Sequence, residues 1–157
     1  MTIPITPISF ETNLPGMVLS NVSASVSDLA PPGTRKHDLI VDRNCAVQVE
    51  LEWDQTGTNP WTDFFMSLAN AAWHAKATLR NVDGGAASTQ TKTEVYAGGP
   101  GPRDLTITFP ADTLAEGTYQ LFLSCHLKAA AGDHLATTFS AAQGQIIEVF
   151  DAALVPG

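Results

Sequence analysis

The chain has 157 residues, of which 44% are hydrophobic and 15% are charged, and these proportions are typical of one folded domain rather than of a disordered chain. Eight Lys and Arg residues stand against sixteen Asp and Glu residues, which gives a net charge of −8. A charge of this sign repels phosphate backbones and anionic lipid, so nucleic acid is not an expected partner. No apolar run approaches the roughly 18 residues of a membrane-spanning helix, so membrane insertion is not expected either.

The amino-terminal residues combine prolines with apolar side chains. Pro4 and Pro7 remove two backbone donors, so residues 1–10 are expected to form an extended arm or an edge strand. The arm is too apolar for a solvated tail and is expected to cover either a neighbouring subunit or its own sheets, through Ile3, Ile5, Ile8 and Phe10. These residues also lack a basic segment followed by an apolar block, so a cytoplasmic location is the default expectation, with export by a signal-independent route left open.

Two strands are expected in the first third of the chain. Residues 17–27 alternate, with a small-residue row (Val18, Ser20, Val22, Ala24 and Val26) predicted to face inward and Leu19 predicted to face outward with the polar row. Residues 45–53 alternate more strongly, with Cys45, Val47, Val49, Leu51 and Trp53 predicted inward. The opposite row, which includes Glu50 and Glu52, is interpreted as a solvated strand face.

The β pattern breaks once, near residues 60–71, where a short helix is expected. Asn59 suits an N-cap and Pro60 suits the first helical position. An apolar stripe at spacings of three and four is expected to cap the core, and its members are Trp61, Phe64, Phe65 and Leu68. Met66 and part of the aromatic surface are then left near solvent, which makes Trp61, Phe64, Phe65 and Met66 candidate contacts for a partner subunit or an apolar ligand.

Further strands are predicted at residues 73–82, 89–96 and 105–109, of which 89–96 has the polar composition of an edge strand. Residues 117–127 form the most regular strand, and its inward row is expected to pack against that of residues 45–53, through Tyr119, Leu121, Leu123, Cys125 and Leu127. Two short strands near 136–141 and 145–150 complete the chain. The glycine-rich loop at 98–102 is interpreted as a turn, because its prolines lack the amide donors of a phosphate cradle.

About eight or nine short strands and one helical insert predict an all-β, antiparallel sandwich that spans residues 1–157 as a single domain. The run Ala115-Glu116-Gly117-Thr118-Tyr119-Gln120-Leu121, together with cysteines on two core strands and tryptophans between them, resembles immunoglobulin-like bacterial β-sandwich domains. In antibody-type domains a tyrosine lies two residues before the second cysteine, whereas Leu123 stands there in this chain. The resemblance therefore implies an architecture and no functional residue.

The two cysteines, Cys45 and Cys125, are expected to lie close together as reduced thiols, with a disulfide across the sheets as the alternative. No cofactor and no catalytic group is expected, since the chain lacks a nucleophile motif such as Gly-x-Ser-x-Gly. A metal site at Cys125 and His126 is not expected, because adjacent residues on a strand point to opposite faces.

Two functional classes stay open at this point. The first is a non-catalytic structural or interaction module that self-assembles or docks to a larger protein complex. The second is a ligand-binding domain in which Trp53, Trp61 or Trp73 holds a carbohydrate or a small apolar molecule.

Overall fold

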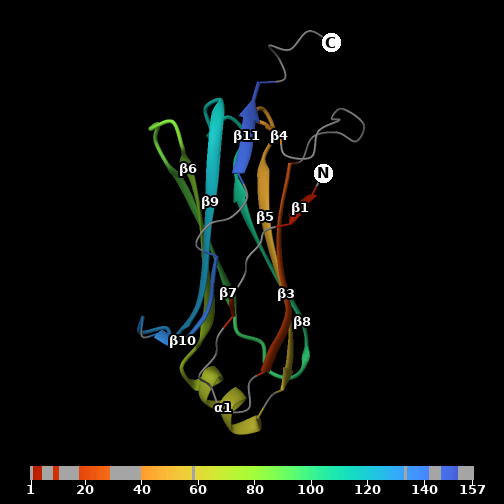
Figure 1. The fold of residues 1–157 in the computed structure, drawn as a ribbon. Coiled ribbons are helices and arrows are strands. Elements are labelled where there is room, and N and C mark those ends of the chain that lie inside the picture. The colour runs from red at the N-terminus through yellow and green to blue at the C-terminus, as the bar shows by residue number, and fades with distance from the viewer. Residues whose placement is uncertain are drawn as a thin grey trace.

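The computed structural model describes residues 2–4, 9–10, 18–28, 40–57, 59–132, 134–141 and 146–151. They form an all-β fold with one helix, in which two curled sheets face each other (Figure 1). Sheet A has the order β1 (Thr2–Pro4), β3 (Val18–Asp28), β5 (Val47–Gly57) and β8 (Gly101–Phe109), with every neighbouring pair antiparallel.

Sheet B is built around β9 (Gly117–Lys128), the strand predicted from the most regular alternation. One edge of β9 pairs with β6 (Ala72–Asn81), which in turn pairs with the edge strand β7 (Ser88–Val95). The other edge is shared by β10 (His134–Ala141) and β11 (Ile146–Phe150). Two short strands extend the sheet, since β2 (Ser9–Phe10) pairs with β10 and β4 (Ile40–Asp42) runs parallel to β11.

The core lies between the two sheets and is filled by alternate residues of their strands. The inward row of β9 is buried as predicted, and so are Val47, Val49, Leu51 and Trp53 of β5 and Trp73, Ala75, Ala77 and Leu79 of β6. All of these side chains belong to one hydrophobic cluster, which confirms that β5 and β9 pack into the same core. Trp53 and Trp73 meet across the sheets in an edge-to-face contact, with ring centroids 5.1 Å apart.

Strand β3 departs from the predicted alternation. Its pairing with β5 shifts between Ser20 and Ser23, where Ser20 lies opposite Asp54 and Ser23 lies opposite Glu52. Asn21 takes a φ of 52°, so this irregularity is a β-bulge with one extra residue on β3. The bulge inverts the faces before it, and Leu19, which was predicted to face outward, packs against the core.

Eleven strands are present in the described residues, rather than eight or nine, because β1, β2 and β4 are too short to show an alternation pattern. The amino-terminal arm supplies two of them. Within this chain, Ile3 of β1 pairs with Val26 and Phe10 of β2 pairs with Phe139, so the arm reaches an edge of each sheet. Ile5 and Ile8, and the side chains of Ile3 and Phe10, lie outside the described residues.

The two cysteines are thiols and form no disulfide with each other. Cys45 precedes β5 by two residues, whereas Trp53, near the other end of that strand, contacts Trp73. Trp73 pairs with Leu127 and Ala75 pairs with Cys125, so Cys125 lies two residues from the level of Trp53, toward the start of β5. Cys45 lies eight residues from that level, so about six residues, or roughly 20 Å, separate the two cysteines along the strands. The prediction that the two cysteines lie close together is therefore wrong.

Candidate functional site

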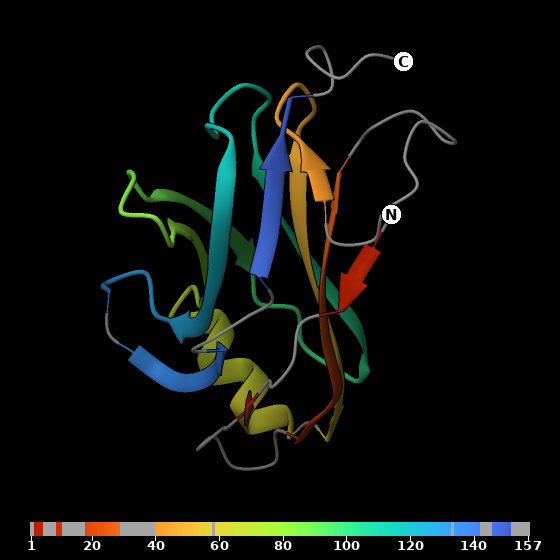
Figure 2. The same ribbon diagram turned by 45° about the horizontal axis from the view of Figure 1, so that its top comes forward.

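The helix α1 (Pro60–Leu68) connects β5 of sheet A to β6 of sheet B and lies across one end of the core (Figure 2). It begins as predicted. The Asn59 side chain accepts a hydrogen bond from the backbone N–H of Trp61 at 2.9 Å, and Pro60 occupies the first turn, where no backbone donor is lost.

The face of α1 that meets the core is the opposite of the predicted one. Thr62 and Met66 are buried, whereas the predicted inward stripe is exposed, with Trp61 at 71%, Phe64 at 53%, Phe65 at 58% and Leu68 at 63% exposure. We call these four side chains the aromatic patch. Met66, a candidate contact residue from the sequence, belongs to the core and not to the patch.

Two anchors explain this orientation of the helix. The Asp63 carboxylate accepts hydrogen bonds from the Tyr96 hydroxyl at 2.7 Å and from the Gly99 N–H at 3.1 Å. Thr62, Asp63 and Met66 share one side of the helix, so the bonds to Asp63 turn Thr62 and Met66 toward the core. The loop fits closely, because a Cβ at Gly98 would lie 3.1 Å from the Asp63 Cγ atom.

A buried polar network fixes the loop beneath the helix. The Gln55 amide donates from Nε2 to the carbonyl oxygens of Ala97 and Gly99 and to the Tyr96 hydroxyl, at 3.0–3.3 Å. Burial, and then the hydrogen bond to Asp63, raise the pKa of Tyr96 well above its usual range, so its hydroxyl stays protonated and donates. Arg103 adds bonds from its guanidinium to the same stretch of carbonyls. The helix is therefore held rigidly, with its aromatic side chains facing solvent.

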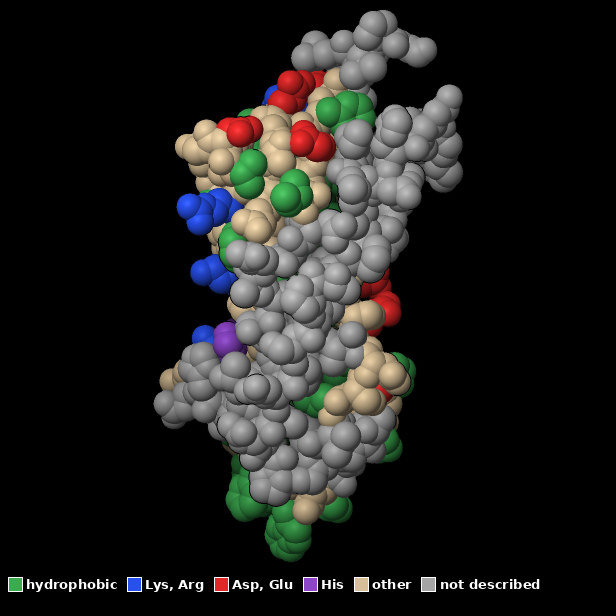
Figure 3. All heavy atoms as spheres, viewed as in Figure 1, with side chains coloured by type: hydrophobic (Ala, Val, Ile, Leu, Met, Phe, Trp, Pro, Cys, Tyr) green, Lys and Arg blue, Asp and Glu red, His purple; other side chains and the backbone are tan. Residues whose placement is uncertain are grey.

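The aromatic patch forms a continuous apolar surface at one end of the molecule. Figure 3 shows hydrophobic side chains gathered at this end, where α1 lies in Figure 1. Phe64 and Phe65 contact each other edge to face, with ring centroids 5.8 Å apart. The patch extends toward β7, because Val95 is 76% exposed and pairs with Ala72, which follows the helix. An apolar surface of this kind is typical of an interaction site.

The tryptophans do not share one surface. Trp53 and Trp73 are almost completely buried, so Trp61 is the one tryptophan that is open to a ligand. Cys125 faces the core and His126 the outside of sheet B, as the strand alternation predicted. Burial raises the pKa of the Cys125 thiol to about 12. Among the described residues, no group of three metal-ligating side chains comes together.

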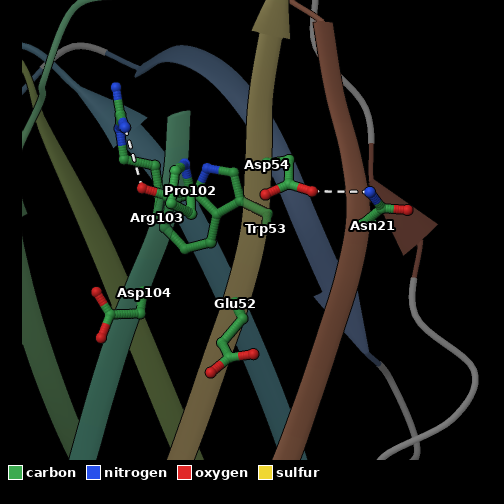
Figure 4. Close-up of a pocket in the computed structure, with 7 residues that line it drawn as sticks. All are labelled: Asn21, Glu52, Trp53, Asp54, Pro102, Arg103 and Asp104. Atoms are coloured by element: carbon green, nitrogen blue, oxygen red, sulfur yellow. Dashed lines mark hydrogen bonds between the residues drawn. The ribbon is translucent and has the colours of Figure 1, made fainter. Parts of the chain in front are cut away.

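The outer face of sheet A carries carboxylates from two adjacent strands, around an open depression of about 470 Å³ (Figure 4). Glu52 lies directly opposite Asp104 in the β5–β8 pairing, and Asp54 accepts a hydrogen bond from the Asn21 amide at 2.7 Å. A hydrogen bond with Glu52, and then burial and the charges of Glu52 and Asp104, raise the pKa of Glu50. The sequence predicted the outward row of β5 but not Asp104 beside it.

The outer face of sheet B carries cations and histidines around a groove of about 430 Å³. His74 of β6 lies directly opposite His126 of β9, and Lys76 lies opposite Ser124. Lys128 ends the same row of β9, opposite Ala72. The alternation predicted that His74 and Lys76 face outward, but the pairing of β6 with β9 is not visible in the sequence.

Among the described residues, no helix has the length and apolar character needed to span a membrane. No protein-family model matches the sequence, and no curated protein is significantly similar to it.

Proposed function

We propose that this protein is a non-catalytic interaction module that docks through its aromatic patch to a protein, either another copy of itself or a different subunit. The observation that carries the proposal is the exposure of Trp61, Phe64, Phe65 and Leu68 on one rigidly anchored helix. Aromatic side chains are enriched at the centres of interfaces, where a few of them contribute most of the affinity.

The energetics support docking rather than solvent exposure. Moving one large apolar side chain from water into a packed interface contributes about 1.5–3 kcal/mol. Four such residues on one helix form the kind of anchor set that fills an apolar groove on a partner. Because α1 is already held by Asp63, little backbone conformational entropy is lost when the patch is covered.

We also propose that the two sheets have the immunoglobulin-like arrangement that the sequence resembles. The Tyr119 hydroxyl supports it by donating a 2.9 Å hydrogen bond to the Ala115 carbonyl, four residues upstream. A tyrosine that bonds back to the chain just before it is a feature of such domains. Many of these domains act by binding other proteins, although the fold by itself does not assign a function.

The first test uses a double variant, Trp61→Ser with Phe64→Ser, and the control Val82→Ser. Val82 is also an exposed apolar residue, but it lies in the β6–β7 turn and not on α1. Light scattering up to high micromolar concentration measures self-association. If the patch joins copies of the chain, the double variant loses the association and Val82→Ser keeps it.

A second arm tests docking to another subunit. A photo-crosslinking amino acid is placed at position 64 and, as the control, at position 82, in the cell that produces the protein. An adduct with one defined protein from position 64 alone supports the proposal. A wild-type protein that is monomeric, together with no adduct specific to position 64, overturns it.

The alternative function, a carbohydrate or small apolar ligand, depends on Trp61 because the other two tryptophans are buried. Two results together would favour this alternative. The wild-type protein binds a soluble glycan or a hydrophobic probe and Trp61→Ser abolishes that binding, while crosslinking from position 64 gives no specific protein adduct.

A further inference from the structure

We propose that copies of this chain stack face to face, with the acidic outer face of sheet A of one copy against the basic outer face of sheet B of the next. This proposal rests on the assembly role proposed above and names its partner, a second copy, but it uses surfaces other than the aromatic patch.

The acidic face gathers like charges without a cation among them. Glu50, Glu52 and Asp54 lie on β5, and Asp104 lies beside them on β8. Like charges directly opposite each other on paired strands destabilise a sheet. Arg103 is the one Lys or Arg of β3, β5 and β8, and its guanidinium bonds to the carbonyls of the 97–99 loop instead. In Figure 4 it points away from Asp104.

The basic face shows the reverse pattern. Lys76 and Arg80 of β6 are exposed, and Lys128 of β9 is half-exposed on the same side of the sheet. Neither β6 nor β9 contains an Asp or a Glu, and Glu148 of β11 lies opposite Thr118, at the other end of β9 from Lys128. His74 and His126 lie opposite each other between the lysines.

The two charged faces match in size as well as in sign. Glu50 and Asp54 are four residues apart on β5, and the row of Lys128 is four residues from Lys76 on β6, so both sets extend over roughly 13 Å. Each set also covers two neighbouring strands. Carboxylates of one copy therefore meet ammonium groups of the next when the two faces stack with their strands aligned.

The position of the two faces determines the kind of assembly. Figure 3 shows Lys and Arg side chains at the border formed by sheet B and Asp and Glu side chains at the opposite border, with further Asp and Glu side chains at the end of the molecule away from α1. Since the faces lie on opposite sides of the molecule, the contact is heterologous and leaves a free face at each end. Repetition of such a contact produces a ring or an open stack.

The net charge of −8 favours this specific contact over non-specific association. Two copies repel each other at long range, so they associate when the basic face of one copy is turned toward the acidic face of the other. The electrostatic complementarity thus sets orientation and register more than it sets affinity.

The test is a charge exchange between two double variants. Glu52→Lys with Asp104→Lys cancels the negative charge of the acidic face, because Glu50 and Asp54 remain beside the two new lysines, whereas Lys76→Glu with Lys128→Glu replaces both lysines of the basic face by carboxylates. Each variant alone is expected to associate roughly tenfold or more weakly than wild type in sedimentation velocity. An equimolar mixture is expected to regain association, since the unchanged acidic face of the second variant then meets the unchanged basic face of the first.

Non-specific attraction does not explain a regain in the mixture. Each double reversal changes the net charge of −8 by four, so both variants remain negative. A control matched to the first variant, Asp83→Lys with Glu116→Lys, raises the net charge by the same four units at exposed positions outside the strands that form the two faces. It is expected to associate as wild type does. Circular dichroism and thermal unfolding establish that all variants are folded.

Three results would overturn the stacking proposal: a monomeric wild type at high micromolar concentration, a mixture that associates no better than its components, or a control variant as defective as the face variants. The result of the charge exchange can be distinguished from the result of the test of the aromatic patch. If Trp61→Ser with Phe64→Ser abolishes association or crosslinking while the charge exchange has no effect, stacking fails and the patch proposal stands. If the patch variant leaves stacking unchanged and no patch-specific adduct forms, the patch proposal fails and stacking stands.

Discussion

The aromatic residues between the sheets and those on α1 are the same kinds of side chain in opposite surroundings. Trp53 and Trp73 contact each other in the core, whereas Trp61 and Phe64 face solvent from a helix that begins only seven residues after Trp53. In a strand, side chains alternate between the two faces of the sheet, so every second residue points into the core. A nine-residue helix presents several faces, and the hydrogen bonds of Asp63 select the buried one. Hydrophobicity therefore predicts burial well in the strands and poorly in α1.

The largest expected difference between core and surface is in thiol reactivity. Cys125 is buried with a pKa raised to about 12, whereas Cys45 is partly exposed. At mildly alkaline pH, the thiolate population of Cys125 is expected to be roughly a thousandfold below that of an ordinary thiol. Alkylation followed by mass spectrometry should label Cys45 first and Cys125 only on unfolding. When protein from the producing cell is denatured without reductant, both cysteines should be alkylated completely. If Cys45 and Cys125 both remain unalkylated, they form a disulfide and the prediction of reduced thiols is wrong.

The Cys125 thiol also predicts a direction for stability against pH. Its folded pKa, about 12, is above the unfolded value of 9.0, so its contribution is complete below pH 9 and is lost as the pH rises toward 12. The raised pKa of Tyr96 acts in the same direction. Urea unfolding between pH 8 and pH 11 or so should show a decline that Cys125→Ala makes less steep. An equal decline in the variant would contradict the assignment to Cys125.

Removing a large side chain from the centre of the core is expected to have the largest effect on stability. Leu121 on β9 is fully buried. Leu121→Ala should lower the free energy of unfolding by about 2–5 kcal/mol, because it removes buried methyl groups and leaves a cavity. Phe122→Ala is the matched control, since Phe122 lies on the outer face of the same strand. A loss under about half a kcal/mol at Leu121 would contradict the register of β9.

The anchor that turns α1 is expected to contribute less than the core. Tyr96→Phe removes the 2.7 Å hydrogen bond to the Asp63 carboxylate and leaves the ring in place. The free energy of unfolding should fall by about 1–3 kcal/mol, since the bond is to a charged group. Asp63→Asn keeps one of the two acceptor oxygens and turns an NH2 donor toward the Tyr96 hydroxyl or the Gly99 N–H, so it should cost at least as much. If both variants are neutral, the orientation of the helix depends on packing and not on this bond.

Substitutions in the aromatic patch are expected to have the smallest effect on folding. Trp61→Ser with Phe64→Ser changes exposed side chains, so the free energy of unfolding should change by no more than about 0.5 kcal/mol per site. Chemical denaturation measures this. A loss as large as that of Leu121→Ala would show that the patch supports the fold, and its exposure would no longer indicate a docking surface.

Much of the fold was predictable from local patterns. The alternation of β5, β6 and β9 defined their inward rows, and Asn59 with Pro60 defined the start of α1, because both signals depend on backbone geometry over a few residues. The exposed edge strand β7 followed from its polar composition in the same way. Such patterns depend on neighbours along the chain and need no knowledge of the partner strands.

Other features depended on contacts between distant segments. The bulge at Asn21 turned Leu19 inward, and the pairing of β6 with β9 brought His74 opposite His126. The position of Asp104 beside Glu52 came from the pairing of β5 with β8. By itself the sequence determined which residues alternate and where the helix begins, because these depend on bonds within a few residues. Only the tertiary structure decided which face of α1 is buried and which charges share a surface, because both depend on pairing between segments far apart in the chain.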